Sequence, residues 1–156
     1  MRLKFYFAVC ALFSVSVLCG MDIVRDGKPS AVIVIPADAS EQEISAAQTL
    51  SKYIKEISGA DLNVVTEDSA PKENAVFIGK VSSLPNDISA KLKIGENILV
   101  SSPVYESYFL AERNKNIYLA GHRGTGSIFA VYDLLERLGC RWFFGCEAGT
   151  VIPKIK

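Results

Sequence analysis

The only histidine of the chain, His122, lies in a glycine-rich stretch, residues 121–126, that reads GHRGTG. We expect this stretch to join a strand to a helix, so that its backbone amides lie at a helix N-terminus, where a carboxylate or phosphate can bind. Arg123 could pair with such an anion. The alternative is that the glycines serve turn geometry and that Arg123 makes a structural hydrogen bond. The glycine spacing differs from the dinucleotide-binding fingerprint, and no cofactor is predicted.

A hydrolytic triad would have to be built around His122, with Ser127 and Asp133 as its other members. These two residues point to different sides of an expected helix, and the sequence contains no Gly-x-Ser-x-Gly nucleophile motif. We expect His122 to be a polar surface residue, and a small hydrolase that uses it is the third of three hypotheses. With one histidine and two cysteines left after export, no tetrahedral metal site is predicted.

Glycoside hydrolysis needs two carboxylates ~5 to 10 Å apart that flank one bond. The acidic candidates are Glu106, Glu112, Glu136 and Glu147, and their spacing does not single out a pair. No catalytic residue is predicted, and the chain is expected to have no activity on its own.

Trp142 lies in the aromatic segment Arg141-Trp142-Phe143-Phe144 and is the other candidate ligand-binding residue, because an exposed tryptophan stacks on sugar rings. The segment could equally be a core strand or a surface that docks another domain. We favour packing or docking, because large aromatic side chains next to a buried helix are usually packed. Phe129, on the polar side of the expected second helix, also fits docking better than sugar contact.

Residues 1–21 have the pattern of a signal peptide: Arg2 and Lys4 are followed by an apolar run over residues 5–18, which includes Cys10. The run is shorter than the ~20 residues of a membrane span, so export to the periplasm or the extracellular space is predicted. Lipid anchoring at Cys19 is the less favoured alternative, because Leu18 stands where a small residue is expected.

Export leaves Cys140 and Cys146, which could form a disulfide across a small loop. The alternative is that Cys140 is a small buried hydrophobic residue of a strand and that strand geometry aims the two sulfur atoms apart.

The mature chain, residues 22–156, has the composition of one globular domain, with 49% hydrophobic residues in the whole sequence. The chain has 17 acidic and 17 basic residues and no basic run after its N-terminus. A balanced charge argues against nucleic acid and against an anionic membrane surface as the main partner.

Hydrophobic periodicity predicts five strands and one helix over residues 31–120. The unbroken apolar run at 31–35 predicts a strand that is covered on both faces. Ser40 and Glu43 form a capping box for a helix that runs to Ser58, with Gly59 as its stop. Further strands are expected at 62–66 and 75–79, and residues 105–111 and 117–120 should pair as an antiparallel hairpin.

A second helix is expected over residues 127–138. Gly121, Gly124 and Gly126 should end the preceding strand by adopting backbone angles that other residues avoid. Gly139 should form a left-handed cap, and residues 140–144 are apolar enough to be the next strand. Together these elements predict an α+β fold with a mixed sheet and two helices packed on one of its faces.

Three stretches carry a family resemblance: AAQTLSKYIKEISGAD at 46–61, the run from GHRGTG through AVYDLLERLGCRWF at 121–143, and VIPK at 151–154. They resemble the N-terminal domain of the family 67 alpha-glucuronidases and of related secreted glycoside-hydrolase-like proteins, some with hexosaminidase-type barrels. The resemblance covers nearly all of residues 22–156.

The resemblance implies a secreted, non-catalytic accessory domain that acts beside a catalytic barrel in the breakdown of polysaccharides such as xylan. The family's catalytic acids lie in the barrel, which this sequence lacks, so none is carried over. The alternative is a free-standing carbohydrate-binding module that uses Trp142 and Arg123.

Overall fold

The computed structural model describes residues 21–86, 88–89, 107–144 and 147–154. Its elements follow one another as β1 (Val24–Arg25), β2 (Lys28–Pro29), β3 (Val32–Ile35), α1 (Glu41–Ser58), β4 (Val64–Thr66), η1 (Glu67–Ser69), β5 (Ala75–Lys80), η2 (Val81–Ser83), β6 (Tyr108–Arg113), β7 (Asn116–Gly121), α4 (Gly124–Arg137), β8 (Arg141–Trp142), η3 (Glu147–Gly149) and β9 (Thr150–Val151).

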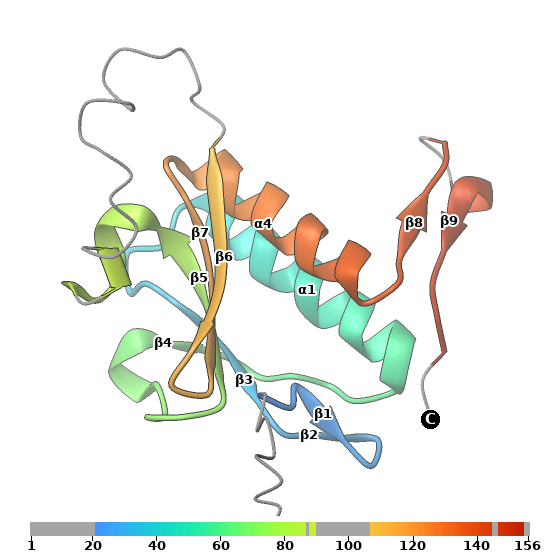
Figure 1. Ribbon diagram of the computed structural model, residues 1–156, viewed down its shortest axis with the longest axis horizontal. Helices are drawn as coiled ribbons and strands as arrows, with labels where there is room; N and C mark the ends of the chain where they lie inside the picture. The colour runs from blue at the N-terminus through green and yellow to red at the C-terminus, as the bar shows by residue number, and fades with distance from the viewer. Residues whose placement is uncertain (1–20, 87, 90–106, 145–146, 155–156) are drawn as a thin grey trace, which may run out of the picture.

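The main sheet has five strands in the order β4-β3-β5-β7-β6 (Figure 1). Four of them are parallel, and β6 pairs with β7 in the antiparallel sense. The predicted mixed sheet is therefore confirmed. The strand predicted at residues 31–35 is β3, which lies inside the sheet, although the middle strand is β5.

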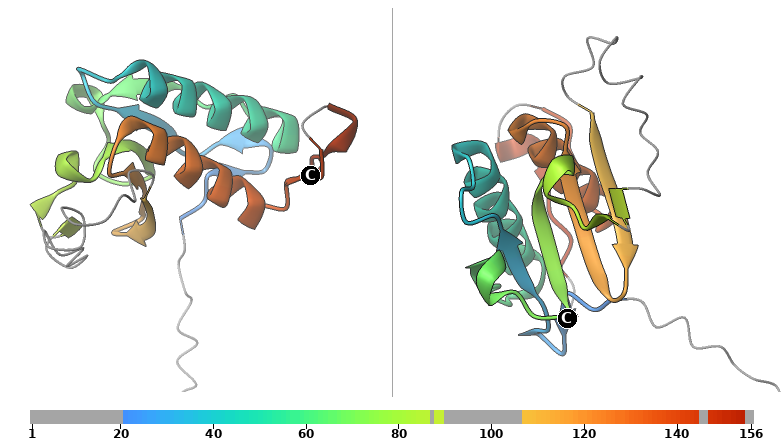
Figure 2. Two further views of the ribbon diagram at one scale, coloured as in Figure 1. Left: turned by 90° about the horizontal axis from the view of Figure 1, so that it is seen from above. Right: turned by 90° about the vertical axis from the view of Figure 1, so that its left-hand side faces the viewer.

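Both helices cover one face of this sheet and lie side by side, as predicted (Figure 2). The core between the two layers is made of alternate residues of the strands and the inner faces of the helices. Its fully buried members include Ile33, Val76, Leu119, Leu50 and Leu135. The α+β fold is thus confirmed, with a mixed sheet on one side and two helices on the other.

Helix α1 begins and ends where the sequence predicts. Ser40 accepts a hydrogen bond from the Glu43 backbone N–H, and the Glu43 side chain accepts one from the Ser40 backbone N–H, so both halves of the capping box are present. Gly59 ends the helix in the left-handed conformation, with φ of 80°. Local chemistry alone therefore defines both ends of this helix.

The predicted hairpin is β6–β7, and its two-residue turn consists of Asn114 and Lys115, both with positive φ. Asparagine tolerates this conformation better than most residues. The next residue, Asn116, is buried, and its side chain accepts from the Ala75 backbone N–H and donates to the Lys72 carbonyl. This side chain ties the hairpin to the start of β5.

The glycines before the second helix do not act as predicted. Helix α4 begins at Gly124 and not at Ser127, and the described glycines with positive φ are Gly27, Gly59 and Gly139. The prediction that Gly121, Gly124 and Gly126 adopt unusual backbone angles was wrong. A methyl group on Gly121 would lie 2.3 Å from the Arg123 carbonyl oxygen, and one on Gly126 would lie 2.6 Å from the Ser107 carbonyl oxygen. Glycine is required at positions 121 and 126 because backbone atoms of other residues lie where a side chain would begin.

Residues 140–144 do not form a further strand of the sheet, which corrects another prediction. Only Arg141–Trp142 is extended, as β8, and it pairs with β9 in a separate ribbon beyond the C-terminal end of α4 (Figure 1). Gly139, with φ of 101°, turns the chain away from the sheet after the helix, as the predicted left-handed cap. Neither of the described α-helices is long and apolar enough to span a bilayer.

Candidate functional site

The carboxyl ends of β3, β5 and β7 meet at one edge of the sheet, and both α1 and α4 begin there. The two helix N-termini are in contact, since a methyl group on Gly124 would lie 2.9 Å from Ser40 Oγ and 3.2 Å from Gln42 Cβ. In sheets of parallel strands, ligands commonly bind at this edge. It is therefore the first place at which to look for a site.

Glu43 is the most unusual residue at this edge, because its carboxyl group is buried and only half satisfied. The residue is 1% exposed. Its Oε2 accepts from Ser40 N and Ser40 Oγ, each at 2.7 Å, whereas Oε1 has no hydrogen-bond partner among the described residues. Oε1 would lie 3.9 Å from a methyl group on Gly79, at the end of β5. A buried polar atom without a partner is costly, so its position calls for an explanation.

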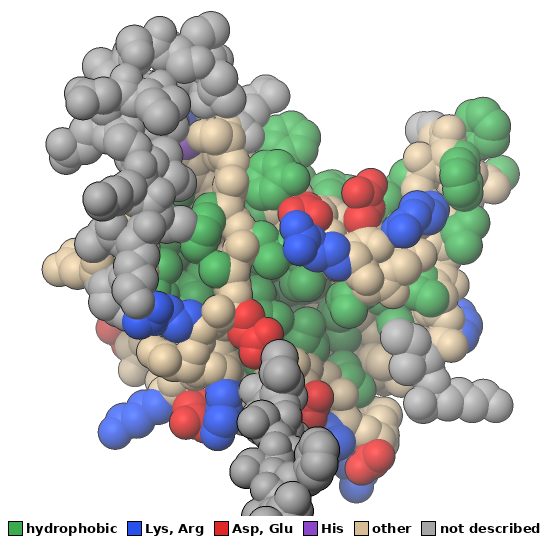
Figure 3. Space-filling view, in the orientation of Figure 1, with side chains coloured by type: hydrophobic (Ala, Val, Ile, Leu, Met, Phe, Trp, Pro, Cys, Tyr) green, Lys and Arg blue, Asp and Glu red, His purple; other side chains and the backbone are tan. Residues whose placement is uncertain are grey.

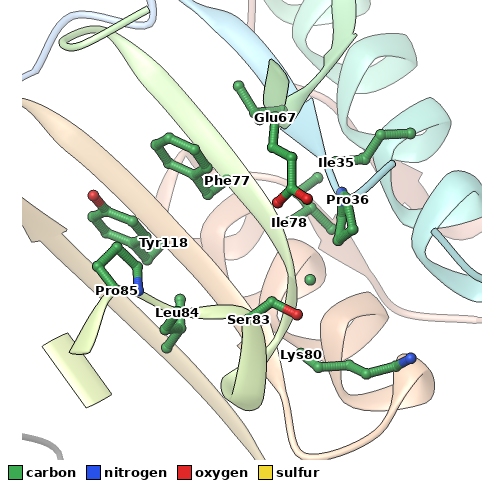
Figure 4. A pocket seen from close by; sticks show the side chains of 12 residues that line it. Ile35, Pro36, Glu67, Phe77, Ile78, Lys80, Ser83, Leu84, Pro85 and Tyr118 are labelled. Atoms are coloured by element: carbon green, nitrogen blue, oxygen red, sulfur yellow. The ribbon is translucent and has the colours of Figure 1, made fainter. Parts of the chain in front are cut away.

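A solvent-open hollow of about 330 Å³ lies beside Gly79, on the face of the sheet that the helices leave uncovered (Figure 4). Phe77 and Tyr118 stack in parallel on this face, with ring centroids 5.0 Å apart. The full lining consists of Val34, Ile35, Pro36, Glu67, Phe77, Ile78, Gly79, Lys80, Ser83, Leu84, Pro85 and Tyr118. The hollow therefore combines apolar walls with a few polar groups, which is the usual composition of a small-ligand pocket.

The polar groups of the hollow come from the ends of two strands. Glu67 follows β4 directly, Lys80 ends β5, and Ser83 ends the short helix after it. In Figure 4 the Glu67 carboxylate and the Ser83 hydroxyl point into the hollow, whereas the Lys80 side chain extends away from it. The hollow itself thus presents acceptor oxygens.

His122 and Arg123 lie between β7 and α4, at the same edge of the sheet. The His122 backbone N–H donates to the Ser107 carbonyl at 2.9 Å, and the Arg123 carbonyl accepts from the Gly126 N–H at 2.9 Å. The side chain of Arg123 is exposed at the N-cap position of α4. A role for either residue in binding an anion stays a prediction.

Ser127 and Asp133 each have another partner. The buried Ser127 hydroxyl donates to the Gly79 carbonyl at 2.7 Å, which joins α4 to the end of β5. Asp133 accepts two hydrogen bonds from Arg137, at 2.9 and 3.1 Å, and this pairing raises the pKa of the Arg137 guanidinium. In the described structure these two residues therefore act as structural contacts and not as a triad with His122.

Trp142 lies at the opposite end of α4 from His122 and Arg123. The helix between them has 14 residues and is about 21 Å long. The indole Nε1–H donates to the Tyr53 hydroxyl at 3.0 Å, and the ring makes edge contacts with Tyr53 and with Tyr132. Trp142 therefore joins the ribbon to both helices, and it does not share a site with Arg123.

The two residues after Trp142 have the opposite environment. Phe143 is 67% exposed and Phe144 is 72% exposed, and Val151 on the paired strand β9 is 51% exposed. Hydrophobic side chains accordingly gather on the protruding ribbon in the space-filling view (Figure 3). We call these three residues the ribbon patch.

Cys140 is fully buried at the end of α4 and is a free cysteine. Burial raises the pKa of its thiol, which disfavours the reactive thiolate. Cys146 lies outside the described residues, so the predicted Cys140–Cys146 disulfide stays a prediction.

The acidic candidates of the sequence do not converge within the described structure. Glu112 accepts from the Met21 backbone N–H at 2.7 Å, and Glu136 is exposed on α4. Glu106 lies outside the described residues, as does the side chain of Glu147. Over the part of the chain that the structure describes, no three His, Cys, Asp or Glu residues lie close enough to hold a metal ion.

Sequence reasoning missed the residues of the hollow. Glu67 and Ser83 belong to polar stretches that read as ordinary loops, and Glu43 was interpreted only as half of a capping box. The available signal was positional: Glu67 and Lys80 lie at the carboxyl ends of β4 and β5, two parallel strands that flank β3 and end at the same edge.

Comparison with known proteins does not assign the chain to a family. No protein-family model matches the chain, and no curated protein matches it. Among solved structures, the chain is similar to a GH138 enzyme targeting pectin rhamnogalacturonan II, with 18% sequence identity and a TM-score of 0.48. The similarity covers 69% of this chain and 13% of that enzyme.

Proposed function

We propose that this chain is a non-catalytic accessory domain of a glycoside-hydrolase-like protein and that it packs against a catalytic barrel domain. The residues that resemble the N-terminal domain of family 67 alpha-glucuronidases support the class of protein. The observation that carries the docking role is the ribbon patch. On this reading the protein is exported and functions in the breakdown of polysaccharides such as xylan.

The ribbon patch has the features of a docking surface. Phe143 and Phe144 directly follow β8, Val151 lies on its partner β9, and all three are more than half exposed. Aromatic residues are enriched where protein surfaces meet, and their transfer from water contributes about 25 cal/mol per Å² buried. The ribbon patch is also held in place, because Trp142 in the same strand contacts both helices.

Phe129 adds a second exposed aromatic on α4, with 43% of its surface accessible. The inner side of the same helix is buried against the sheet, so Phe129 is not needed for the core. An exposed phenylalanine on a charged helix surface is consistent with contact to a neighbouring domain.

The second candidate is the free-standing carbohydrate-binding module that uses Trp142 and Arg123. Arg123 precedes α4 and Trp142 follows it, the helix is about 21 Å long, and two tyrosines contact the Trp142 ring. One sugar unit would not reach both residues, so a module of this kind would need an oligosaccharide. We therefore rank it second.

The first experiment measures hydrolysis. The purified chain should release no product from aldouronic acids or from chromogenic glycosides, because the proposal places the reaction in another domain. Robust turnover that survives repurification would refute the accessory role.

The second experiment tests the ribbon patch directly. A fluorescent dye that reports exposed apolar surface should bind the folded chain, and Phe143→Ser with Phe144→Ser should remove most of this signal while the melting temperature is kept. Val64→Ser, an exposed residue of β4, is the matched control and should leave the signal unchanged. A signal that is insensitive to the double substitution would contradict the docking role.

The third experiment separates the two candidates. Xylan oligosaccharides are titrated against the wild type and against Trp142→Ala by calorimetry. The accessory role predicts no heat that depends on Trp142, whereas binding that Trp142→Ala abolishes in a folded variant would favour the module.

A further inference from the structure

We propose that the hollow beside Gly79 binds an organic ammonium ion, that is, a primary amine carried on an apolar body. This site is separate from the ribbon patch and does not depend on the docking role. The inference rests on the shape of the hollow, on its apolar wall and on the oxygen atoms that surround it.

The apolar part of the site is the stacked pair of Phe77 and Tyr118 together with Pro36 and Pro85. In Figure 4 these side chains form the wall of the hollow at the carboxyl end of β5. The hollow is shallow and open to solvent, and the space within it holds only a water-sized group. We therefore expect the ammonium head to enter the hollow and the apolar body of the ligand to lie against the Phe77–Tyr118 pair.

The polar part of the site favours a hydrogen-bond donor with positive charge. Glu67 has no ion pair among the described residues, and its carboxylate points into the hollow. The Ser83 hydroxyl supplies a further acceptor, and Lys80 extends away from the hollow. An ammonium group has three donors and no acceptor, so it matches this set of atoms.

The Glu43 side chain gives independent support, because one of its carboxyl oxygens lies close to Gly79 and lacks a hydrogen-bond donor among the described residues. The residue is 1% exposed and its Oε1 has no partner among the described residues. Oε1 would lie 3.9 Å from a methyl group on Gly79, a residue that lines the hollow. An unsatisfied carboxyl oxygen makes the potential in the hollow more negative, and an anionic ligand is disfavoured for the same reason.

The experiment titrates the full chain with three probes of one shape: benzylammonium, benzyl alcohol and benzoate. Benzylammonium should bind about tenfold more tightly than benzyl alcohol, since a hydrogen bond between charged groups is stronger than one from a neutral hydroxyl. Benzoate should not bind. Equal binding of the amine and the alcohol, or no binding of any probe, would overturn the proposal.

Variants then locate the site. Glu67→Gln should weaken benzylammonium binding about tenfold. Glu41→Gln, in the exposed first turn of α1, is the matched control and should leave it unchanged. Lys80→Met should keep or increase the affinity, because it removes a positive charge from the rim. If Glu41→Gln weakens binding as much as Glu67→Gln, the effect is one of overall charge and the site assignment fails.

Discussion

The two helices begin side by side at one edge of the sheet, but they begin in different ways. Helix α1 starts with a capping box in which the Ser40 and Glu43 side chains replace missing backbone partners. Helix α4 starts at Arg123 without a side-chain cap, and its first turn contains Gly124 and Gly126. One helix start is stabilised by polar side chains and the other depends on the absence of side chains. The first kind is visible in a sequence, whereas the second requires the neighbouring backbone to be known.

The strongest test of this contrast is Gly126→Ala. Helix propensity alone predicts that alanine stabilises α4 by about 1 kcal/mol. The geometry predicts the opposite, because the new methyl group would lie 2.6 Å from the Ser107 carbonyl oxygen and 2.7 Å from the Gly121 Cα. Since both are backbone atoms, we expect a loss of about 3 kcal/mol in the free energy of unfolding. Urea denaturation measures this free energy of unfolding. A variant more stable than the wild type would show that the nearby Ser107 and Gly121 backbone does not exclude a side chain at position 126.

The second test removes the side-chain cap of α1. Ser40→Ala deletes the hydroxyl that bonds the Glu43 backbone N–H and the Glu43 carboxyl group, so a loss of about 1 to 2 kcal/mol is expected. Ser45→Ala, at an exposed position inside the same helix, should change stability by less than about 0.5 kcal/mol. Equal effects of the two substitutions would argue against the capping box.

The third test concerns the C-terminal end of α1, where only the backbone conformation of Gly59 disfavours a side chain. Gly59 has φ of 80°, and no atom lies within 4 Å of an added methyl group. Gly59→Ala should therefore cost about 1 kcal/mol, purely for the left-handed backbone. Thermal unfolding followed by circular dichroism gives this value. An unchanged midpoint would mean that the helix end can relax.

The smallest effect is expected from Gly124→Ala, which links the two helix starts. Its methyl group would meet Ser40 Oγ at 2.9 Å, and a side-chain hydroxyl can move where a backbone atom cannot. We expect a change below about 1 kcal/mol. In the Ser40→Ala background the contact with Ser40 Oγ is gone and the one with Gln42 Cβ, at 3.2 Å, remains, so Gly124→Ala should cost less than in the wild type. A double-mutant cycle measures this coupling, and strictly additive effects would show that the helix starts are independent.

Several elements could be predicted because their causes are local. The capping box and Gly59 define α1, and the Asn114-Lys115 turn, where both residues have positive φ, sets the antiparallel pairing of β6 with β7. The inner face of α4 follows from hydrophobic periodicity, as the burial of Val131 and Leu135 confirms.

The errors have a common physical origin. The sequence predicts the start of α4 three residues late because the glycines before it are expected to end the preceding strand, whereas Gly126 lies inside the helix and against the Ser107 carbonyl. Residues 140–144 have the composition of a strand, but only Arg141–Trp142 is extended and it pairs outside the main sheet. The start of α4 and the pairing of Arg141–Trp142 cannot be predicted from the local sequence. Both depend on which distant segment of the chain packs or pairs there.

The amino-acid sequence by itself determined both ends of α1, the hairpin and the α+β layers of this protein, because caps, turns and hydrophobic periodicity act over a few residues. The tertiary structure alone decided that Trp142 is held between two tyrosines while Phe143 and Phe144 face solvent. It also brought Glu43, Glu67 and Ser83 around Gly79. The physical reason is that parallel strands distant in sequence end at one edge, where side chains meet that no local pattern relates.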